Sequence, residues 1–320
     1  MTVLVLAREF DPTADAVVRE LCSRGVPVFR TDLCEFPTRL RLRAELGGDG
    51  RWSGALSTRH REVRLSDIRS IWHRNPSTFA FPASMTAPEQ DFAHREAKLG
   101  LGGVLAALDV LWANHPNRCA DSIFKPYQWK VAAECGLEVA ETMITNCPDS
   151  ARRFVDRVPS GTITKALGPA GITEQDSPMV AYTRRISVDD FADPSGVSTT
   201  ATTLQSFVSK HHEVRLTVIG DRWFPIAIHA HADGARVDWR SDPSALTYEF
   251  VPIPEAVVTG IAEYMRRMHL VYTAVDFVVT PEDRWVMLEA NSGPQFAWLE
   301  AATGAPMVAA MAELLMAETA

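Results

Sequence analysis

Two apolar segments near the end of the chain, separated by a short turn, constrain the fold most. The first reads Ala-Val-Asp-Phe-Val-Val from residue 274, the second reads Trp-Val-Met-Leu-Glu-Ala-Asn from residue 285, and a turn spans residues 281–284. In a simple hairpin Asp276 lies opposite Glu289, because positions equidistant from the turn face each other. Asn291 follows Glu289 by two residues and so points to the same side of its strand. The sequence therefore predicts two carboxylates and an amide at one place in a sheet.

A pair of facing carboxylates requires compensation. Like charges directly opposite each other destabilise a sheet, and oxygens of Asp, Glu and Asn are the ligands that a hard cation such as Mg²⁺ prefers. The alternative is a solvated acidic pair on an outer face. Apolar residues on both sides of each segment favour buried strands instead. We therefore predict that Asp276, Glu289 and Asn291 hold magnesium, as one ion or two.

Composition limits the class of protein and its partners. A chain of 320 residues, 46% of them hydrophobic, is long enough for two or three domains with large cores. Its net charge of -8 argues against nucleic acid or an anionic membrane as a partner. Five cysteines without a CxxC pair favour a reducing compartment, and the apolar start resembles a buried strand rather than a signal peptide. We expect a cytoplasmic protein.

The order of elements predicts an α/β fold in three parts. A strand over residues 2–6, a helix over 15–23 and a strand over 26–30 are typical of a parallel sheet layered with helices. Short strands then surround a glycine turn at 47–50, before a helix over 88–111. The three domains are expected at residues 1–115, 116–200 and 201–320.

The second and third parts differ in their patterns. The second begins with a helix between Pro126 and Gly136, and its polar stretch from Gly168 to Gly196 predicts mobile loops. The third has strands over residues 204–208, 214–219 and 223–229, a helix over 254–269, the hairpin, and a final helix over 307–318.

Two lysines occupy positions that favour phosphate. Lys165 ends a strand-like run and precedes the Gly168-Pro-Ala-Gly171 loop, so an ammonium and a flexible loop would approach a phosphate together. Lys125 begins a helix, whose N-terminus also attracts anions. Each alone is more often a solvated surface lysine. Together with a magnesium site they favour a nucleotide-binding protein.

In this order the motifs resemble those of the ATP-grasp ligases, such as the ribosomal-protein glutamate ligases. The motifs are Lys125, Lys165, Leu204-Gln-Ser-Phe-Val208, Glu213-Val-Arg215, Asp276 and Leu288-Glu-Ala-Asn291. Four further stretches are similar to the graspetide ligases, which make microviridin-type cross-linked peptides: Trp72-His-Arg-Asn-Pro76, Asn114-His-Pro116, Phe124-Lys-Pro-Tyr-Gln128 and Thr145-Asn146. The resemblance covers nearly the whole chain.

The resemblance implies an ATP-grasp fold in which an N-terminal pre-ATP-grasp domain precedes two subdomains that clasp ATP. It implies that magnesium binds Asp276, Glu289 and Asn291, and that Arg215 steadies the transferring phosphoryl group. It further implies a set of ATP contacts: Lys125, Lys165, Gln205, Ser206, Phe207, Val208, Glu213 and Arg240. Of these, Glu213 would hold the ribose. Ser206 stands where relatives often have an acidic residue, and the loop after Lys165 carries fewer glycines than in the glutamate ligases. A salt bridge with Glu213 is the structural alternative for Arg215.

The implied substrate is a ribosomally made precursor peptide, with a leader and a core, whose Asp or Glu side chains are joined to Ser, Thr or Lys. A basic cluster could meet an acidic peptide, although a solvated strand face explains it equally well: Arg59, His60, Arg61, Arg64, Arg69 and Arg74. Arg184 and Arg185 are candidates to bind the reacting carboxylate. Relatives make a homodimer plausible. One alternative adds free amino acids to a peptide or small acid, and another is a regulatory ATP-binding module without catalysis.

Four histidines invite a different interpretation. His211 and His212 are adjacent, and His229 and His231 alternate so as to share a strand face. A third ligand at fitting spacing is missing from the sequence pattern. We interpret them as ordinary sheet histidines.

Overall fold

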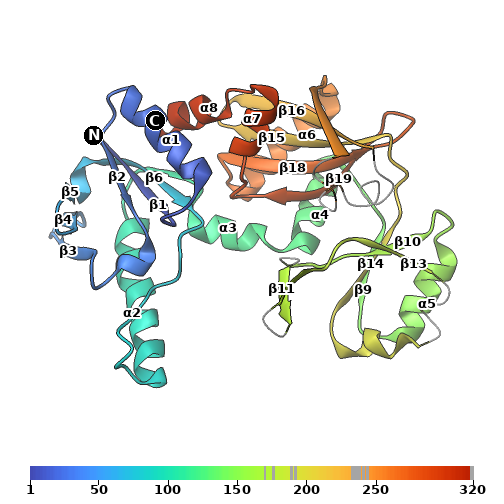
Figure 1. Cartoon of the computed structure of the whole chain (residues 1–320), viewed down its shortest axis with the longest axis horizontal. Helices are drawn as coiled ribbons and strands as arrows, with labels where there is room; N and C mark the ends of the chain where they lie inside the picture. The colour runs from blue at the N-terminus through green and yellow to red at the C-terminus, as the bar shows by residue number, and fades with distance from the viewer. Residues whose placement is uncertain are drawn as a thin grey trace.

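The structure is a computed structural model that describes residues 1–168, 171–174, 177–187, 190, 193–231, 239, 242 and 245–317. Figure 1 shows an N-terminal α/β unit at the left, a sheet with its helices at the upper right, and a smaller sheet below it. The helices α3 (Pro116–Ser122) and α4 (Lys125–Glu134) lead from the first unit to the others. The three units surround the site described below.

The N-terminal unit is built on a parallel sheet with the strand order β2-β1-β6-β7. Its strands are β1 (Thr2–Ala7), β2 (Val28–Thr31), β6 (Ile68–Arg74) and β7 (Leu111–Ala113). Side chains of β1 alternate between two cores. Val3 and Val5 pack with helix α1 (Pro12–Ser23), whereas Leu4 and Leu6 pack with helix α2 (Ala87–Ala106) on the other face. The predicted strand–helix–strand opening is confirmed, and α2 ends five residues earlier than expected.

A three-stranded antiparallel sheet extends the N-terminal unit. It contains β3 (Arg41–Leu46), β4 (Trp52–Ser57) and β5 (Glu62–Arg64), and the glycines at 47–50 form the first turn. Gly54 has a φ of +130°, and a Cβ there would lie 2.0 Å from the carbonyl oxygen of Arg43. A side chain at this position would therefore force the two strands apart.

The C-terminal unit contains a six-stranded sheet with the order β17-β16-β15-β18-β19-β8. Its strands are β15 (His212–Ile219), β16 (Arg222–Ala230), β17 (Leu246–Phe250), β18 (Tyr272–Val279), β19 (Trp285–Asn291) and the short β8 (Glu138–Val139). Helices α4 and α6 (Glu255–Met268) cover one face, where Val131, Ile261 and Phe277 share a core. All eight residues of β18 are buried, as its apolar pattern predicts.

The smaller sheet has the antiparallel order β13-β10-β14-β9. Its strands are β9 (Thr142–Thr145), β10 (Thr162–Thr164), β13 (Arg184–Ile186) and β14 (Thr202–Ser206), and Phe154 of helix α5 (Pro148–Arg157) packs in its core with Leu204. A hairpin of β11 (Gly171–Glu174) and β12 (Ser177–Val180) lies within the stretch predicted to be loops, so that expectation is wrong there. The sheet extends to Ser206, beyond the domain boundary expected at residue 200.

The two chain ends lie close together because the last helix returns to the first unit (Figure 1). Helix α8 (Met307–Met316) packs beside α1, and its Met311 and Leu315 share a core with Val3 and Val17. The hydroxyl of Ser70 on β6 donates a hydrogen bond to the carbonyl of Leu315 at 2.7 Å. Helix α7 (Ala297–Thr303) contributes Leu299 to the same core. The first and third units are thus joined by one continuous core.

This shared core predicts a large loss of stability when Leu315 is replaced. Leu315→Ala should lower the free energy of unfolding by about 2–5 kcal/mol, because the side chain is fully buried and leaves a cavity. Glu313→Ala on the same helix is the control, since its ion pairs with Arg24 and Arg222 lie at the surface and contribute little to stability. Urea unfolding measures both. Equal stability of the two variants would contradict the shared core.

Candidate active site

The hairpin of β18 and β19 places Asp276 opposite Glu289, as the sequence predicts. The pairing of the two strands nevertheless differs from that of a simple hairpin. Val279 pairs with Trp285, which makes the turn one residue longer than expected, and the register shifts back at Leu288. This bulge turns two consecutive residues, Leu288 and Glu289, toward one cavity, while Met287 packs in the core beneath.

Arg215 compensates the charge of Asp276 across the sheet. It lies on β15 directly opposite Asp276, and its Nη1 donates to both carboxylate oxygens, at 2.8 and 3.0 Å. Asn291 points to the same place, where its Nδ2 lies 3.3 Å from Oδ2 of Asp276. Arg215 and Asp276 are 8% and 3% exposed, so this pair is largely withdrawn from water. Little solvent screening reaches it, which strengthens the attraction.

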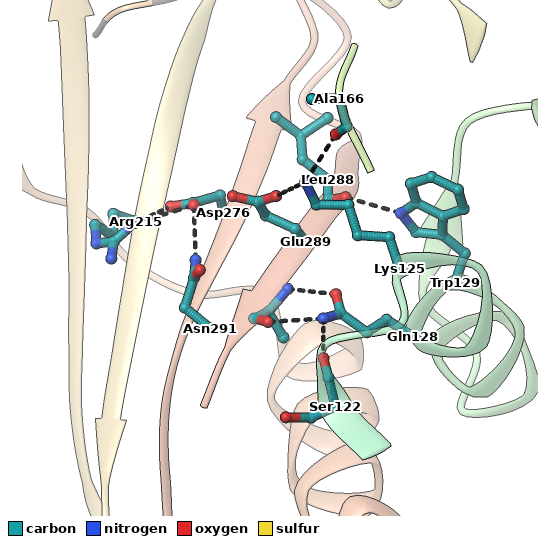
Figure 2. Close-up of polar contacts among 11 residues, drawn as sticks. Ser122, Lys125, Gln128, Trp129, Ala166, Arg215, Asp276, Leu288, Glu289 and Asn291 are labelled. Atoms are coloured by element: carbon teal, nitrogen blue, oxygen red, sulfur yellow. Dashed lines mark hydrogen bonds and ion pairs between the residues drawn. The ribbon is translucent and has the colours of Figure 1, made fainter. Parts of the chain in front are cut away.

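Lys125 compensates Glu289 from the opposite side. Its Nζ lies 3.0 Å from Oε2 of Glu289 and donates to the carbonyl of Ala166 at the same distance. Figure 2 shows the resulting row of side chains, in which Asp276 and Glu289 lie in the middle with Arg215 at one end and Lys125 at the other. Helix α4 and the sheet thus contribute opposite charges to one site.

Two residues that the sequence analysis did not assign fix helix α4 against β19. Gln128 is buried and forms a pair of hydrogen bonds with the backbone of Ala290, at 2.8 and 2.9 Å. The indole of Trp129 donates to the carbonyl of Leu288 at 2.8 Å (Figure 2), and the ammonium of Lys165 lies 5.1 Å from the centre of that ring. The bulge carbonyl therefore has a partner, and Lys125 and Lys165 lie close to it.

A cavity of about 960 Å³ lies between the two sheets and helix α4. Eleven of the predicted site residues line it: Lys125, Lys165, Gln205, Ser206, Phe207, Val208, Glu213, Arg215, Asp276, Glu289 and Asn291. The segment that leaves β14 supplies its second wall. Most of the predicted site is therefore brought together.

The segment after β14 carries aromatic and charged groups at the mouth of the cavity. The guanidinium carbon of Arg185 lies 3.6 Å from the centre of the Phe207 ring, a close stacking contact. Glu213 forms an ion pair with Lys210, a cavity residue that the sequence analysis missed. A lysine three residues before a candidate ribose-binding glutamate was the available signal.

The remaining predicted residues lie elsewhere. Arg74 is buried, and its guanidinium lies 3.4 Å from the carboxylate of Asp11. Arg184 is exposed and pairs with Asp190. Arg240 falls outside the described residues. Within the basic cluster Arg59, His60, Arg61 and Arg64 are exposed, whereas Arg69 is half-buried.

The N-terminal unit holds the backbone that follows Asn291. Nη1 of Arg74 donates to the carbonyl of Gly293 at 3.1 Å. The side chain of Asn114 donates to the carbonyls of Tyr272 and Ser292, both at 2.7 Å, and accepts from the backbone of Val271 at 2.8 Å. Burial raises the pKa of Tyr272 to about 12, and its hydroxyl accepts a hydrogen bond from the indole of Trp72 at 3.2 Å. The motifs around Trp72 and Asn114 thus form a clamp on the Ser292–Gly293 backbone.

The histidines form contacts with each other rather than a metal cluster. The rings of His212 and His229 are 5.3 Å apart, and Nε2 of His229 lies 2.8 Å from a carboxylate oxygen of Glu249. Burial and the neighbouring His229 and His211 lower the pKa of His212, so its imidazole is neutral at pH 7. Among the described residues no group of three or more His, Cys, Asp or Glu gathers to hold a metal. The part of the chain that the structure describes also contains no helix that could span a membrane.

Comparisons with known proteins identify the fold. The MvdD pre-ATP grasp domain matches residues 2–119. No curated protein sequence matches the chain significantly. A RiPP-associated ATP-grasp ligase from Chryseobacterium gregarium, in complex with ADP and a leader and core peptide, superposes with a TM-score of 0.89 at 24% identity, covering 98% of this chain and 96% of that one.

Two further structures share the fold. Macrocyclase MdnB from Microcystis aeruginosa MRC gives a TM-score of 0.80 at 25% identity, with 98% and 99% of the chains covered. The ATP-grasp ligase PsnB, complexed with a phosphomimetic variant of its minimal precursor, Mg and ADP, gives 0.76 at 20% identity, with 98% and 97% covered. The fold predicted from the sequence motifs is confirmed: this chain has an ATP-grasp fold, and its first domain matches the MvdD pre-ATP grasp domain.

Proposed function

We propose that this chain is an ATP-dependent ligase that cross-links the side chains of a ribosomally made precursor peptide. One observation carries the proposal: Asp276, Glu289 and Asn291 converge in the cavity, with Arg215 at one end of the carboxylate row and Lys125 at the other. This charge pattern suits a nucleotide triphosphate with its metal ion. The C. gregarium ligase is in complex with ADP and a leader and core peptide, and PsnB with Mg, ADP and a precursor variant, which supports the same substrates here.

The residues fit magnesium and a triphosphate. Two carboxylates and an amide are hard oxygen ligands, and Mg²⁺ commonly takes few protein oxygens because phosphates complete its shell. Nε of Arg215 is buried without a hydrogen-bond partner, a donor available to a phosphoryl oxygen. In this proposal Asp276, Glu289 and Asn291 hold the metal, which when bound would neutralise charge on the phosphates.

The opposite end of the cavity fits the base and sugar. Gln205, Ser206, Phe207 and Val208 would form the hinge beside adenine, with Phe207 as its aromatic surface. Glu213 would accept hydrogen bonds from the ribose hydroxyls, and Lys125 and Lys165 would contact the phosphates. We retain Arg240 as a further phosphate contact on the resemblance alone.

The chemistry follows from the weakness of a carboxylate as an electrophile. A substrate carboxylate oxygen attacks the γ-phosphorus, the bond to the β-phosphate oxygen breaks, and ADP leaves. The resulting acyl phosphate offers a good leaving group to a hydroxyl or amine. Arg215 would neutralise the negative charge that develops during both steps. Such electrostatic stabilisation is usually the largest single contribution that a preorganised site makes to the reaction rate.

The peptide would reach the site from the rim. Arg184 and Arg185 lie on β13 outside the cavity and remain candidates to bind it, as do the exposed arginines of β5 and its preceding turn. Arg74 is buried in the clamp, so we assign it a structural role rather than the substrate contact expected from the sequence. A homodimer stays a prediction.

We propose three domains at residues 1–115, 116–206 and 207–320, with the second boundary moved so that β14 stays within its sheet.

All five cysteines are free thiols, which supports a cytoplasmic location. Mass spectrometry of candidate precursor peptides, including any short one encoded beside this gene, tests the activity. Loss of one water per link supports cross-linking, whereas incorporation of labelled glutamate would favour addition of free amino acids. Nucleotide binding without ADP release would favour a regulatory module.

The carboxylate row predicts a strict requirement for both acids. Asp276→Asn and Glu289→Gln should each reduce ADP formation by about 100-fold or more, because each removes a negative oxygen ligand without changing shape. Asp283→Asn, in the exposed turn of the same hairpin, is the control, since Asn tolerates the positive φ of 61° there. A coupled assay for ADP measures all three. Turnover near the wild-type rate in either site variant would remove the metal assignment.

The hinge predicts a specific loss of nucleotide affinity. Phe207→Ala should raise the KM for ATP by about fivefold with little change in kcat, since a stacked ring contributes about 1 kcal/mol to binding. Phe250→Ala, exposed at the end of β17, is a control of the same residue type. Initial rates over a range of ATP concentrations give both constants. An unchanged KM would place the adenine elsewhere.

A further inference from the structure

A second, smaller cavity opens beside the carboxylate row. Its volume is about 300 Å³, and six of the described residues line it: Arg215, Trp239, Glu289, Asn291, Gln295 and Trp298. Five of these also line the larger cavity, all but Trp298. The two cavities therefore meet at the residues that we assign to phosphoryl transfer. A group in the smaller cavity would lie next to the reacting phosphate.

The far wall of this side cavity is aromatic. The indoles of Trp239 and Trp298 stack with ring centres 5.7 Å apart, and the ring of Tyr248 meets Trp298 edge-on at 5.8 Å. Gln295 is exposed at the margin and carries an amide that can donate or accept a hydrogen bond. Among the described residues that line it there is no lysine, in contrast to the larger cavity with Lys125, Lys165 and Lys210. Such a wall favours a neutral group on an aliphatic stem over a second phosphate.

The wall is rigidly connected to the metal residues. Gln295 follows Asn291 by four residues, and the intervening Ser292 and Gly293 are held by the clamp of Asn114 and Arg74. Helix α7 then presents Trp298, while the next residue, Leu299, is anchored in the core shared by the first and third units. Trp298, the part of the aromatic wall on helix α7, is thereby fixed relative to Asn291.

We propose that this side cavity is the acceptor subsite, which takes the hydroxyl- or amine-bearing side chain of the peptide. The proposal rests on the proposed function. The oxygen or nitrogen of that side chain attacks the acyl carbon, the bond from that carbon to the phosphate oxygen breaks, and phosphate departs with the proton that the nucleophile loses. The indoles hold the aliphatic stem and exclude water, which would otherwise hydrolyse the acyl phosphate.

The test measures coupling, the number of cross-links formed per ADP released. The probe is a precursor peptide that the wild-type protein cross-links, sought among any short reading frames beside this gene. Trp298→Ala and Gln295→Ala should lower coupling by about tenfold, with ADP and phosphate still released and unmodified peptide recovered. Added hydroxylamine should then trap the acyl phosphate as a peptide hydroxamate, because a small nucleophile does not need the wall. Trp298→Phe, which keeps an aromatic wall, should restore coupling.

Controls separate this proposal from the general function. Trp223→Ala removes a half-buried indole elsewhere on the same sheet and should leave coupling unchanged. The acceptor subsite would be overturned if Trp298→Ala and Gln295→Ala both kept the coupling of the wild type. It would also be overturned if these variants lost ADP release and hydroxamate formation together. Absence of ADP and product in the wild type would instead overturn the proposed function.

The peptide itself identifies the nucleophile. One variant peptide has every Ser and Thr replaced by Ala, and another has every Lys replaced by Arg. Loss of links in one of them supports the subsite and names a hydroxyl or an amine. Unchanged links in both would contradict it.

Discussion

Two facing carboxylates, Asp276 and Glu289, set the requirements that the rest of the structure meets. Like charges paired across a strand ladder and removed from water are costly unless cations lie close by. Arg215 supplies one from the neighbouring strand, and Lys125 supplies the other from helix α4. The chain thus carries charges that a triphosphate and its metal ion can reorganise, within a rigid frame that Gln128 and Trp129 tie to the same strand.

The N-terminal unit takes part in the site through the backbone rather than through side chains that reach the cavity. Buried polar groups need partners, and Arg74 and Asn114 find theirs in the carbonyls that follow Asn291. Helix α8 closes the same interface with apolar contacts. This arrangement explains why the motifs at Trp72–Arg74 and Asn114 accompany the ATP-grasp motifs in one chain. They hold the end of strand β19, which carries Asn291, in position.

The sequence predicted those parts of the fold that periodicity and symmetry govern. Strand geometry predicted that Asp276 faces Glu289. The observed turn is one residue longer than predicted, and the bulge at Leu288 shifts the register back by one residue, so the predicted pair still forms. The burial of Arg74 could not be predicted, since it depends on Asp11 and Gly293, which are distant in sequence. Gln128 was missed for the same reason, since its partner is Ala290. Lys210 was missed although its partner Glu213 lies only three residues away. The strands of the β11–β12 hairpin escaped notice because polar, glycine-containing segments carry no apolar alternation.

The central claim is that Asp276, Glu289 and Asn291 bind a divalent ion together with the nucleotide. Calorimetric titration of a non-hydrolysable ATP analogue, with and without Mg²⁺, tests it without any peptide. The account predicts that Mg²⁺ tightens binding to the wild type by about tenfold or more, and that Asn291→Ala loses most of this gain. The same metal dependence in both proteins would contradict it.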